Sequence, residues 1–288
     1  MEASITRSIH DYCRKAIRET ITQFQPDVIH FHGVDAHSYI PETDIPSLLT
    51  LHCPVSFYSP SIFEEHRLNF FLNCVSASQR LTCPKRPNLL EEIPNGVPVP
   101  PSSLPQNKSD FVIALGRICP EKNFHAAIEA AKAANISLVL AGSIFSYPEH
   151  EEYFQTQIIP NLDAKRRFIG PIGGRRKWEL LASAQCLLVP SLAEETSCLV
   201  AMESLAAGTP VVAFGSGALP EIVDHGVTGF LVENVDEMAK AIPSTKELGP
   251  EICRATARKR FSSEMMTSRY VDLYQELALL RLPGALCP

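Results

Sequence analysis

Apolar positions that recur every three to four residues mark the first regular element of the chain. Over residues 4–24 this spacing is typical of an amphipathic helix. Pro26 interrupts the helix, because proline has no amide hydrogen to donate, and the apolar run from Val28 to Phe31 follows. The pattern therefore predicts a helix that leads into a buried strand.

Further short apolar runs between turns extend this first domain. They cover Ser47 to Leu51, Phe70 to Val75 and a brief run that ends at Ile93, before the turn Pro94-Asn95-Gly96. Buried strands separated by helical segments are typical of a parallel sheet in an α/β domain. We therefore expect an α/β fold, with the first domain over residues 1–100.

A proline-rich, polar segment from Val97 to Asp110 disfavours regular structure and suits an exposed link, which we place at residues 101–110. Beyond it, apolar strands alternate with helical patterns, as in a doubly wound sheet. The predicted strands are Phe111 to Leu115, Ser137 to Ala141, Arg167 to Ile169, Cys186 to Val189 and Pro210 to Phe214. A last helical stretch runs from about Glu251 to Leu280, so we expect the second domain over 111–262 and a closing helix within 263–288.

The composition fits two such domains and excludes several classes of protein. With 288 residues and 45% hydrophobic side chains, the chain can build two cores, which excludes a disordered chain and a fibrous repeat. Lysine and arginine total 26 against 32 aspartates and glutamates, a formal net charge of -6, so we expect no nucleic acid as a partner. A small anionic ligand would need a local basic pocket.

The 9 cysteines are scattered and form no CxxC pair, which favours reduced thiols in a cytosolic protein. The amino-terminal segment MEASITRSIHDYCRK lacks the apolar core of a signal peptide. No run approaches the roughly 18 apolar residues of a membrane span. We therefore expect a cytoplasmic protein, with peripheral contact to a membrane surface left open.

Two basic residues follow the strand that ends at Leu115. Gly116-Arg117 and then Glu121-Lys122 occupy a strand-to-helix connection, the place where open α/β sheets bind ligands. Glycine allows the backbone to approach closely, and Arg117 and Lys122 can offer positive charge to a diphosphate as it departs. The alternative interpretation is an ordinary solvated surface.

Two carboxylates eight positions apart, Glu195 and Glu203, follow the strand that ends near Pro190. If the chain becomes helical near Ser197, the partial positive charge of the helix N-terminus attracts phosphate between them. The arrangement fits a sugar diphosphonucleoside, with sugar hydroxyls on Glu195 and ribose hydroxyls on Glu203. The alternative is a surface helix that begins with an acidic residue.

Two turns of small residues favour the ligand-binding interpretation. Gly208-Thr209-Pro210 leads into a very apolar strand, and the loop Gly215 to Ala218 opens another helix at Leu219-Pro220-Glu221. Small-residue loops that face one cleft form a nest of backbone amides for an anion.

Taken in order, these motifs resemble those of the retaining glycosyltransferases of family 4. The matching segments are Gly116-Arg117 with Glu121-Lys122, Phe168-Ile169-Gly170, Pro190-Ser191, the Glu195 and Glu203 pair, Gly208 to Val212, Leu219 to Val223, and Gly226 to Val232. The resemblance implies a GT-B fold, in which two Rossmann-like, doubly wound domains face a cleft and the last helix packs back on the first domain. It also implies transfer of a sugar, with retention of configuration, from a nucleoside diphosphate donor linked to UDP or GDP. The acceptor would be a hydroxyl of a carbohydrate, a lipid-linked compound or a small molecule, and no cofactor is expected.

The resemblance also assigns roles to residues. Arg117 and Lys122 would hold the donor diphosphate, Glu195 the transferred sugar and Glu203 the ribose. The implied donor-binding residues are Gly116, Arg117, Lys122, Glu195, Thr196, Ser197, Cys198, Leu199 and Glu203, and the implied catalytic residues are Glu195, Arg117, Lys122 and His52. The family commonly has Phe-Gly where this chain has Ser197-Cys198, so the packing of the sugar pocket is expected to differ. No cluster of Asp or His has the spacing of metal ligands, which agrees with cationic side chains acting in place of a metal.

The first domain resembles the family at Asp27 to His32 and at Leu51-His52. A histidine at the carboxyl end of a strand lies at the cleft, where His52 could orient the sugar or an acceptor. For His52 and for His30, the alternative is a histidine satisfied by local hydrogen bonds. A basic cluster is interpreted as a solvated face, with base or phosphate contact as its alternative; it comprises Arg166, Arg167, Arg175, Arg176 and Lys177.

Relative to the family pattern, the first domain lacks a strand with a glycine-rich loop and two further strand and helix units before Asp27. We expect a shortened domain with an exposed sheet edge, explained by a truncated reading frame, by a compact variant or by a partner chain that completes it. Two alternatives to transfer follow. One is a catalytically weak, nucleotide-sugar-binding chain that needs a partner to capture the acceptor, and the other is a GT-B sugar-nucleotide epimerase, against which the segment Glu195 to Leu199 argues.

Overall fold

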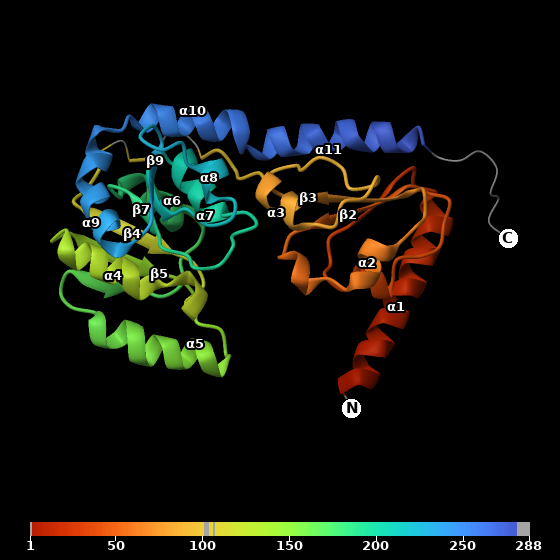
Figure 1. The fold of residues 1–288 in the computed structure, drawn as a ribbon, viewed down its shortest axis with the longest axis horizontal. Helices are drawn as coiled ribbons and strands as arrows, with labels where there is room; N and C mark the ends of the chain where they lie inside the picture. The colour runs from red at the N-terminus through yellow and green to blue at the C-terminus, as the bar shows by residue number, and fades with distance from the viewer. Residues whose placement is uncertain (1, 101–103, 106, 281–288) are drawn as a thin grey trace. The chain divides into compact units, whose positions relative to one another are not determined.

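The chain divides into two compact units in the computed structural model, which describes residues 2–100, 104–105 and 107–280 (Figure 1). Unit 1 comprises the chain up to Pro94 and from Thr267 onward, and unit 2 runs from Asn95 to Met266. Each unit carries a parallel sheet with helices, which confirms the predicted α/β class. Residues 101–103 and 106 of the predicted link lie outside the described residues.

Unit 1 is built on a three-stranded parallel sheet in the order β1-β2-β3. Helix α1 (Glu2–Phe24) leads into β1 (Ile29–Phe31), followed by β2 (Ser47–Leu51) and β3 (Phe70–Cys74), with the short helices α2 (Pro60–Glu64) and α3 (Ala77–Thr82) after β2 and β3. These elements confirm the predicted helix and first three strands within one or two residues at each end. The sheet buries an apolar core that includes Phe31, Leu49, Leu51, Phe70 and Leu72.

The brief strand predicted to end at Ile93 is wrong. Leu89 forms only an isolated bridge with Leu72, and the amide of Ile93 donates to the carbonyl of Cys74. The apolar run is too short for a strand because Pro87 and Pro94 bound it, and proline does not donate to a ladder.

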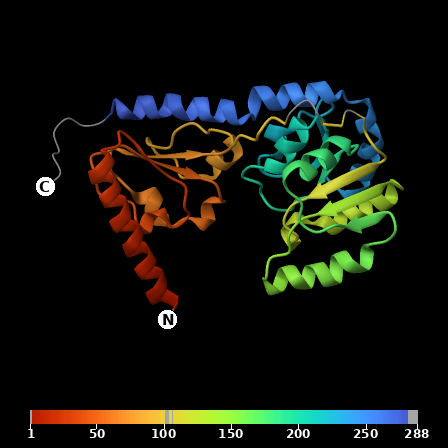
Figure 2. The same ribbon diagram turned by 180° about the vertical axis from the view of Figure 1, so that it is seen from behind.

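The long helical stretch predicted from Glu251 to Leu280 is two helices, α10 (Pro250–Arg260) and α11 (Ser263–Ala278). The break falls at Phe261 and Ser262, where the Ser262 hydroxyl accepts a hydrogen bond from the amide of Met265 and so begins the second helix. Within unit 1, α11 lies along the sheet in both views (Figures 1 and 2). The hydroxyl of Tyr274 lies 2.6 Å from Nδ1 of His30, and that of Tyr270 lies 3.1 Å from Oγ1 of Thr50.

Unit 2 contains a six-stranded parallel sheet in the order β6-β5-β4-β7-β8-β9. Its strands are β4 (Phe111–Leu115), β5 (Ser137–Ala141), β6 (Arg166–Phe168), β7 (Leu187–Val189), β8 (Val211–Phe214) and β9 (Gly229–Val232). The first five were predicted, with their ends shifted by at most one residue. The sixth was not, because its short run begins at a glycine, a residue depleted in strands.

Helices cover both faces of this sheet, as the doubly wound pattern predicts (Figure 1). One face packs on α6 (Gly174–Ser183), α7 (Leu199–Ala206), α8 (Leu219–Ile222) and α10, and the other on α4 (Phe124–Ala133), α5 (Pro148–Tyr153) and α9 (Val235–Ser244). Alternation along β4 shows the division, since Ile113 is buried on the α7 side and Val112 and Ala114 on the α4 side. None of the helices in the described residues is long and apolar enough to cross a membrane.

His30 gives unit 1 a predictable dependence on pH. Burial, together with the nearby rings of His32 and His52, lowers the pKa of His30 to about 3. The unfolded chain takes up this proton below about pH 6.5, whereas the folded chain takes it up only near pH 3. The stabilising effect of the neutral ring is therefore complete above pH 6.5 and is lost progressively as the pH falls from 6.5 toward 3.

We expect the unfolding free energy of wild type, measured in urea, to fall between pH 6.5 and 5 more steeply than that of His30→Gln. The difference in slope is at most one proton, about 1.4 kcal/mol per pH unit. His66→Gln, at an exposed position, serves as the control and should keep the wild-type slope. Equal slopes for wild type and His30→Gln would contradict the prediction.

Candidate functional site

A cavity of about 390 Å³ lies in unit 2 at the carboxyl ends of β4 and β7. The order of the sheet reverses between these two strands, and ligands of open α/β sheets bind at such a reversal. We call this cavity the switch-point pocket. It is lined by Leu115, Gly116, Arg117, Lys122, Phe124, Lys177, Leu188, Val189, Pro190, Ser191, Glu195, Ser197, Cys198, Leu199, Val200 and Glu203.

A larger cavity, of about 680 Å³, lies in unit 1. Its lining includes Asp44 and Asn69, which precede β2 and β3 and so lie at the amino ends of those strands. The carboxyl ends of parallel strands are where ligands of this architecture bind. For this reason the smaller switch-point pocket is the stronger candidate.

The segment after β4 brings positive charge to the switch-point pocket. A side chain on Gly142 would come within 1.7 Å of the carbonyl oxygen of Gly116, so the two backbones pass at a distance that only glycine allows. Beyond Gly116, the guanidinium of Arg117 lies 5.6 Å from the ring centre of Phe145, and its Nη2 lies 3.5 Å from a carboxylate oxygen of Glu121. The Arg117 side chain remains 41% exposed, which leaves it accessible to an anion.

Lys122 and Glu195 form an ion pair in the switch-point pocket, with 2.5 Å between Nζ and Oε1. The Glu195 side chain is only 9% exposed and that of Lys122 is 26% exposed. The two loops that carry them are joined through their backbones, because the amide of Leu192 donates to the carbonyl of Glu121 at 2.9 Å. The pair therefore holds a cation and a carboxylate at fixed positions beside one cavity.

A second ion pair, between Lys177 and Glu203, occupies the same pocket with 2.5 Å between Nζ and Oε1. Lys177 belongs to α6 and Glu203 to α7. The sequence interpretation placed Lys177 in a solvated basic cluster, a description that fits Arg175, whose side chain is 84% exposed. No local pattern distinguishes the two residues, because the partner of Lys177 lies 26 positions away.

Helix α7 begins at Leu199, two residues after the predicted position, with Cys198 as its N-cap. Cys198 lines the pocket but is only 4% exposed, and it packs in the core of that sheet face. Ser197 also lines the pocket, and its Oγ is buried with no hydrogen-bond partner among the residues that the structure describes. A buried hydroxyl without a partner favours a site that a polar ligand completes.

The loop from Gly215 to Ala218 holds the backbone at Glu195 through hydrogen bonds. The amide of Ala218 donates to the carbonyl of Glu195 at 2.7 Å, and the Ser216 hydroxyl donates to the carbonyl of Ala193 at 2.6 Å. Gly217 has a φ of +54°, and a side chain there would lie 2.3 Å from the Glu195 carbonyl oxygen. The structure thus joins the Gly215 loop to the Glu195 loop. The prediction that Gly208-Thr209-Pro210 faces the same cleft is wrong, because this turn precedes β8 and lies at the amino end of that strand.

Eight of the nine predicted donor-binding residues line the switch-point pocket, and Thr196 does not. His52 lies in unit 1, where its amide donates to the hydroxyl of Tyr58 at 2.7 Å and its Nε2 lies 3.0 Å from Nδ1 of His32. Burial and the nearby His32 lower the pKa of His52, so the ring is neutral at pH 7. His30 is satisfied by Tyr274 and by Thr50, as its alternative interpretation expected.

Comparisons with known proteins agree with this geometry. The sequence pattern of the family described as "Glycosyl transferases group 1" matches residues 99–260. The chain is 36% identical over 123 residues to the D-inositol 3-phosphate glycosyltransferase of Saccharomonospora viridis, which covers 40% of this chain and 28% of that protein. It is 28% identical over 206 residues to the phosphatidyl-myo-inositol mannosyltransferase of Mycobacterium leprae, which covers 65% of this chain and 54% of that protein.

Among solved structures, Anabaena HepE in complex with UDP-glucose is similar to 91% of this chain and 82% of its own, with a TM-score of 0.72 and 19% identity. That likeness concerns the fold. The chain spans about a quarter of the first of the two curated relatives and about half of the second.

Gly217 offers a direct test of how the pocket is held. Gly217→Ala places a side chain against the Glu195 backbone at a positive φ, so we expect the unfolding free energy to fall by about 1–3 kcal/mol. Gly215→Ala is the matched control, because a side chain there meets no atom within 4 Å and should change stability by less than about 0.5 kcal/mol. Urea unfolding measures both variants, and an equal loss in the two would contradict the assignment.

Proposed function

Because the chain belongs to the glycosyl transferases group 1 family and has the GT-B fold, we propose that it transfers a sugar from a nucleoside diphosphate donor to a hydroxyl acceptor. The observation that carries the proposal is the switch-point pocket, in which three cations and two carboxylates surround one cavity. A nucleotide sugar combines a dianionic diphosphate with hydroxyl-rich groups on either side. Cations bind the diphosphate, and carboxylates accept hydrogen bonds from the hydroxyls.

Arg117 and Lys122 would bind the diphosphate. As the bond between the sugar and the phosphate oxygen breaks, negative charge develops on the departing nucleoside diphosphate, and fixed cations stabilise it. The ion pair with Glu195 supports this role, because it holds the Lys122 ammonium in place before the donor arrives. These two side chains supply the charge that a metal ion supplies in other phosphate sites, so the proposed reaction needs no metal.

Glu195 would accept hydrogen bonds from the hydroxyls of the transferred sugar, and Glu203 from those of the ribose. The start of α7 lies between them in the sequence, and the backbone amides at a helix N-terminus attract phosphate. The unpartnered hydroxyl of Ser197 supports a further polar contact with the donor. Lys177 would orient the Glu203 carboxylate from the opposite helix.

We also propose that the transfer retains the configuration of the sugar and that the chain belongs to family 4. Both proposals rest on the order of the sequence motifs. In such a reaction the acceptor oxygen bonds to the anomeric carbon on the face from which the diphosphate leaves, and the proton of the acceptor hydroxyl passes to the departing diphosphate. The donor is proposed to carry uridine or guanosine, and the acceptor to be a carbohydrate, a lipid-linked compound or a small molecule. The role of His52 in orienting the sugar stays a prediction.

A transfer assay tests this proposal with a panel of UDP- and GDP-linked sugars, a mixture of hydroxyl acceptors and product detection by mass. Glu195→Gln and Lys122→Ala should each lower kcat about 10²- to 10³-fold, because each removes a group that acts on the charged transition state. Glu194→Gln and Lys132→Ala are the controls, since both residues are exposed and lie outside the pocket. They should keep the wild-type rate.

Thermal unfolding of each variant separates loss of function from loss of fold. Donor binding without turnover in wild type would overturn transfer and favour the nucleotide-sugar-binding alternative. Absence of donor binding in a folded wild-type chain would overturn both.

A further inference from the structure

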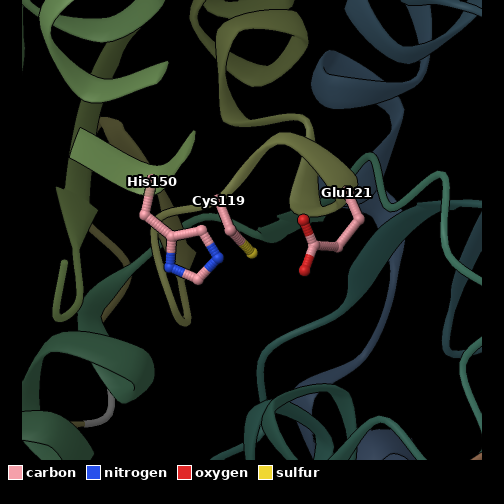
Figure 3. A group of neighbouring side chains, drawn as sticks. All are labelled: Cys119, Glu121 and His150. Atoms are coloured by element: carbon pink, nitrogen blue, oxygen red, sulfur yellow. The ribbon is translucent and has the colours of Figure 1, made fainter. Parts of the chain in front are cut away.

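Three potential metal ligands meet beside the segment that carries Lys122. Their donor atoms, the Cys119 sulfur, a Glu121 carboxylate oxygen and a His150 ring nitrogen, all lie within 4.8 Å of one another (Figure 3). Cys119 and Glu121 follow β4, whereas His150 comes from α5. The trio therefore joins two segments of unit 2 that are far apart in the sequence.

His150 contributes a buried imidazole to this group. The residue is 8% exposed, and its Nδ1 is buried with no hydrogen-bond partner in the described part of the chain. The other ring nitrogen points toward the Cys119 sulfur, and the Glu121 carboxylate lies on the far side of that sulfur (Figure 3). Nε2 is therefore the nitrogen that an ion held among the three side chains would meet, and Nδ1 lies on the side of the ring away from the sulfur (Figure 3).

We propose that Cys119, Glu121 and His150 bind one zinc-class divalent cation. A thiolate, an imidazole and a carboxylate are all ligands that zinc accepts, and three protein ligands leave its fourth tetrahedral position for water. The thiolate and imidazole favour zinc over magnesium or calcium, which prefer oxygen ligands. Cys119 is fully buried, so binding exchanges its thiol proton for the ion and releases that proton to solvent.

Such an ion would fasten the donor-binding segment to α5. The carbonyl of Glu121 already accepts hydrogen bonds from the amide of Leu192 and the hydroxyl of Ser191, so the ion site and the Glu195 loop share one residue. Coordination of the Glu121 carboxylate would also compete with its ion pair to Arg117 and make that guanidinium available to an anion. The ion acts on the structure of the segment and takes no part in the sugar transfer proposed above.

Cobalt(II) provides the test, because a thiolate bound to Co²⁺ gives an intense charge-transfer band in the near ultraviolet. The full chain, reduced and stripped with a chelator, is titrated with Co²⁺ and then with Zn²⁺. We expect the band to saturate at one Co²⁺ per chain and to be abolished by stoichiometric Zn²⁺. Cys119→Ala should abolish it, while Glu121→Gln and His150→Gln should weaken Co²⁺ binding by more than about tenfold.

The control is Cys74→Ala, which removes a buried thiol elsewhere, in unit 1, where the sulfurs of Cys74 and Cys83 lie 3.5 Å apart. It should keep the full band. A band that survives in Cys119→Ala, one that disappears in Cys74→Ala, or no band in wild type would each overturn the proposal. Far-ultraviolet circular dichroism confirms that each variant is folded, and His150→Gln carries the test if Cys119→Ala does not fold. The readout is independent of sugar transfer, so its failure leaves the proposed function untouched.

Discussion

The reversal of strand order between β4 and β7 is the constraint on which the site depends. The chain runs from β4 to α4 on one face of the sheet, and from β7 to α7 on the other face. Because the two connections diverge, neither covers the carboxyl ends of the central strands. The cavity that results is bounded by Gly116 and Arg117 on one side and by Pro190 and Ser191 on the other, so topology alone determines which residues meet there.

Within that opening, charge is arranged in pairs. Each of the two pocket carboxylates has a lysine at 2.5 Å, and the members of each pair come from different elements of unit 2. Partly buried ion pairs are screened less by solvent than exposed ones, so these pairs hold their side chains in fixed positions. An incoming nucleotide sugar meets both signs of charge already in place, and the backbone bond from Leu192 to Glu121 links the cationic and acidic loops.

The sequence was sufficient for features that local pattern determines. The strands Phe111 to Leu115 and Ser137 to Ala141 form as predicted because continuous apolar runs between turn signals identify buried strands. Glu195, Glu203 and Lys122 could be placed at one site because each follows a strand that ends at the same edge of the sheet. The run before Ile93 was wrongly predicted as a strand, because the prolines that bound it limit it to an isolated bridge. The strand from Gly229 was missed, because glycine is depleted in strands, yet it forms at the edge of the sheet.

Features that arise from tertiary contacts could not be predicted from the sequence. In the sequence, Lys177 cannot be distinguished from its exposed neighbours. Its ion pair with Glu203 depends on the packing of α6 near α7. Cys119, Glu121 and His150 show no ligand spacing, because β5 and its connections separate the first two from the third. The hydroxyl of Ser197 has no partner within the described part of the chain, and this too depends on which atoms surround it and not on any motif.

Hydrogen–deuterium exchange in the presence and absence of UDP and of GDP tests most directly whether the switch-point pocket holds the donor. Bound nucleotide stabilises the segments that it contacts and slows exchange of their amides. We expect slower exchange in peptides that cover residues 115–122 and 195–203 with at least one of the two nucleotides. Exchange that slows only in unit 1, or that does not change with either nucleotide, would contradict it.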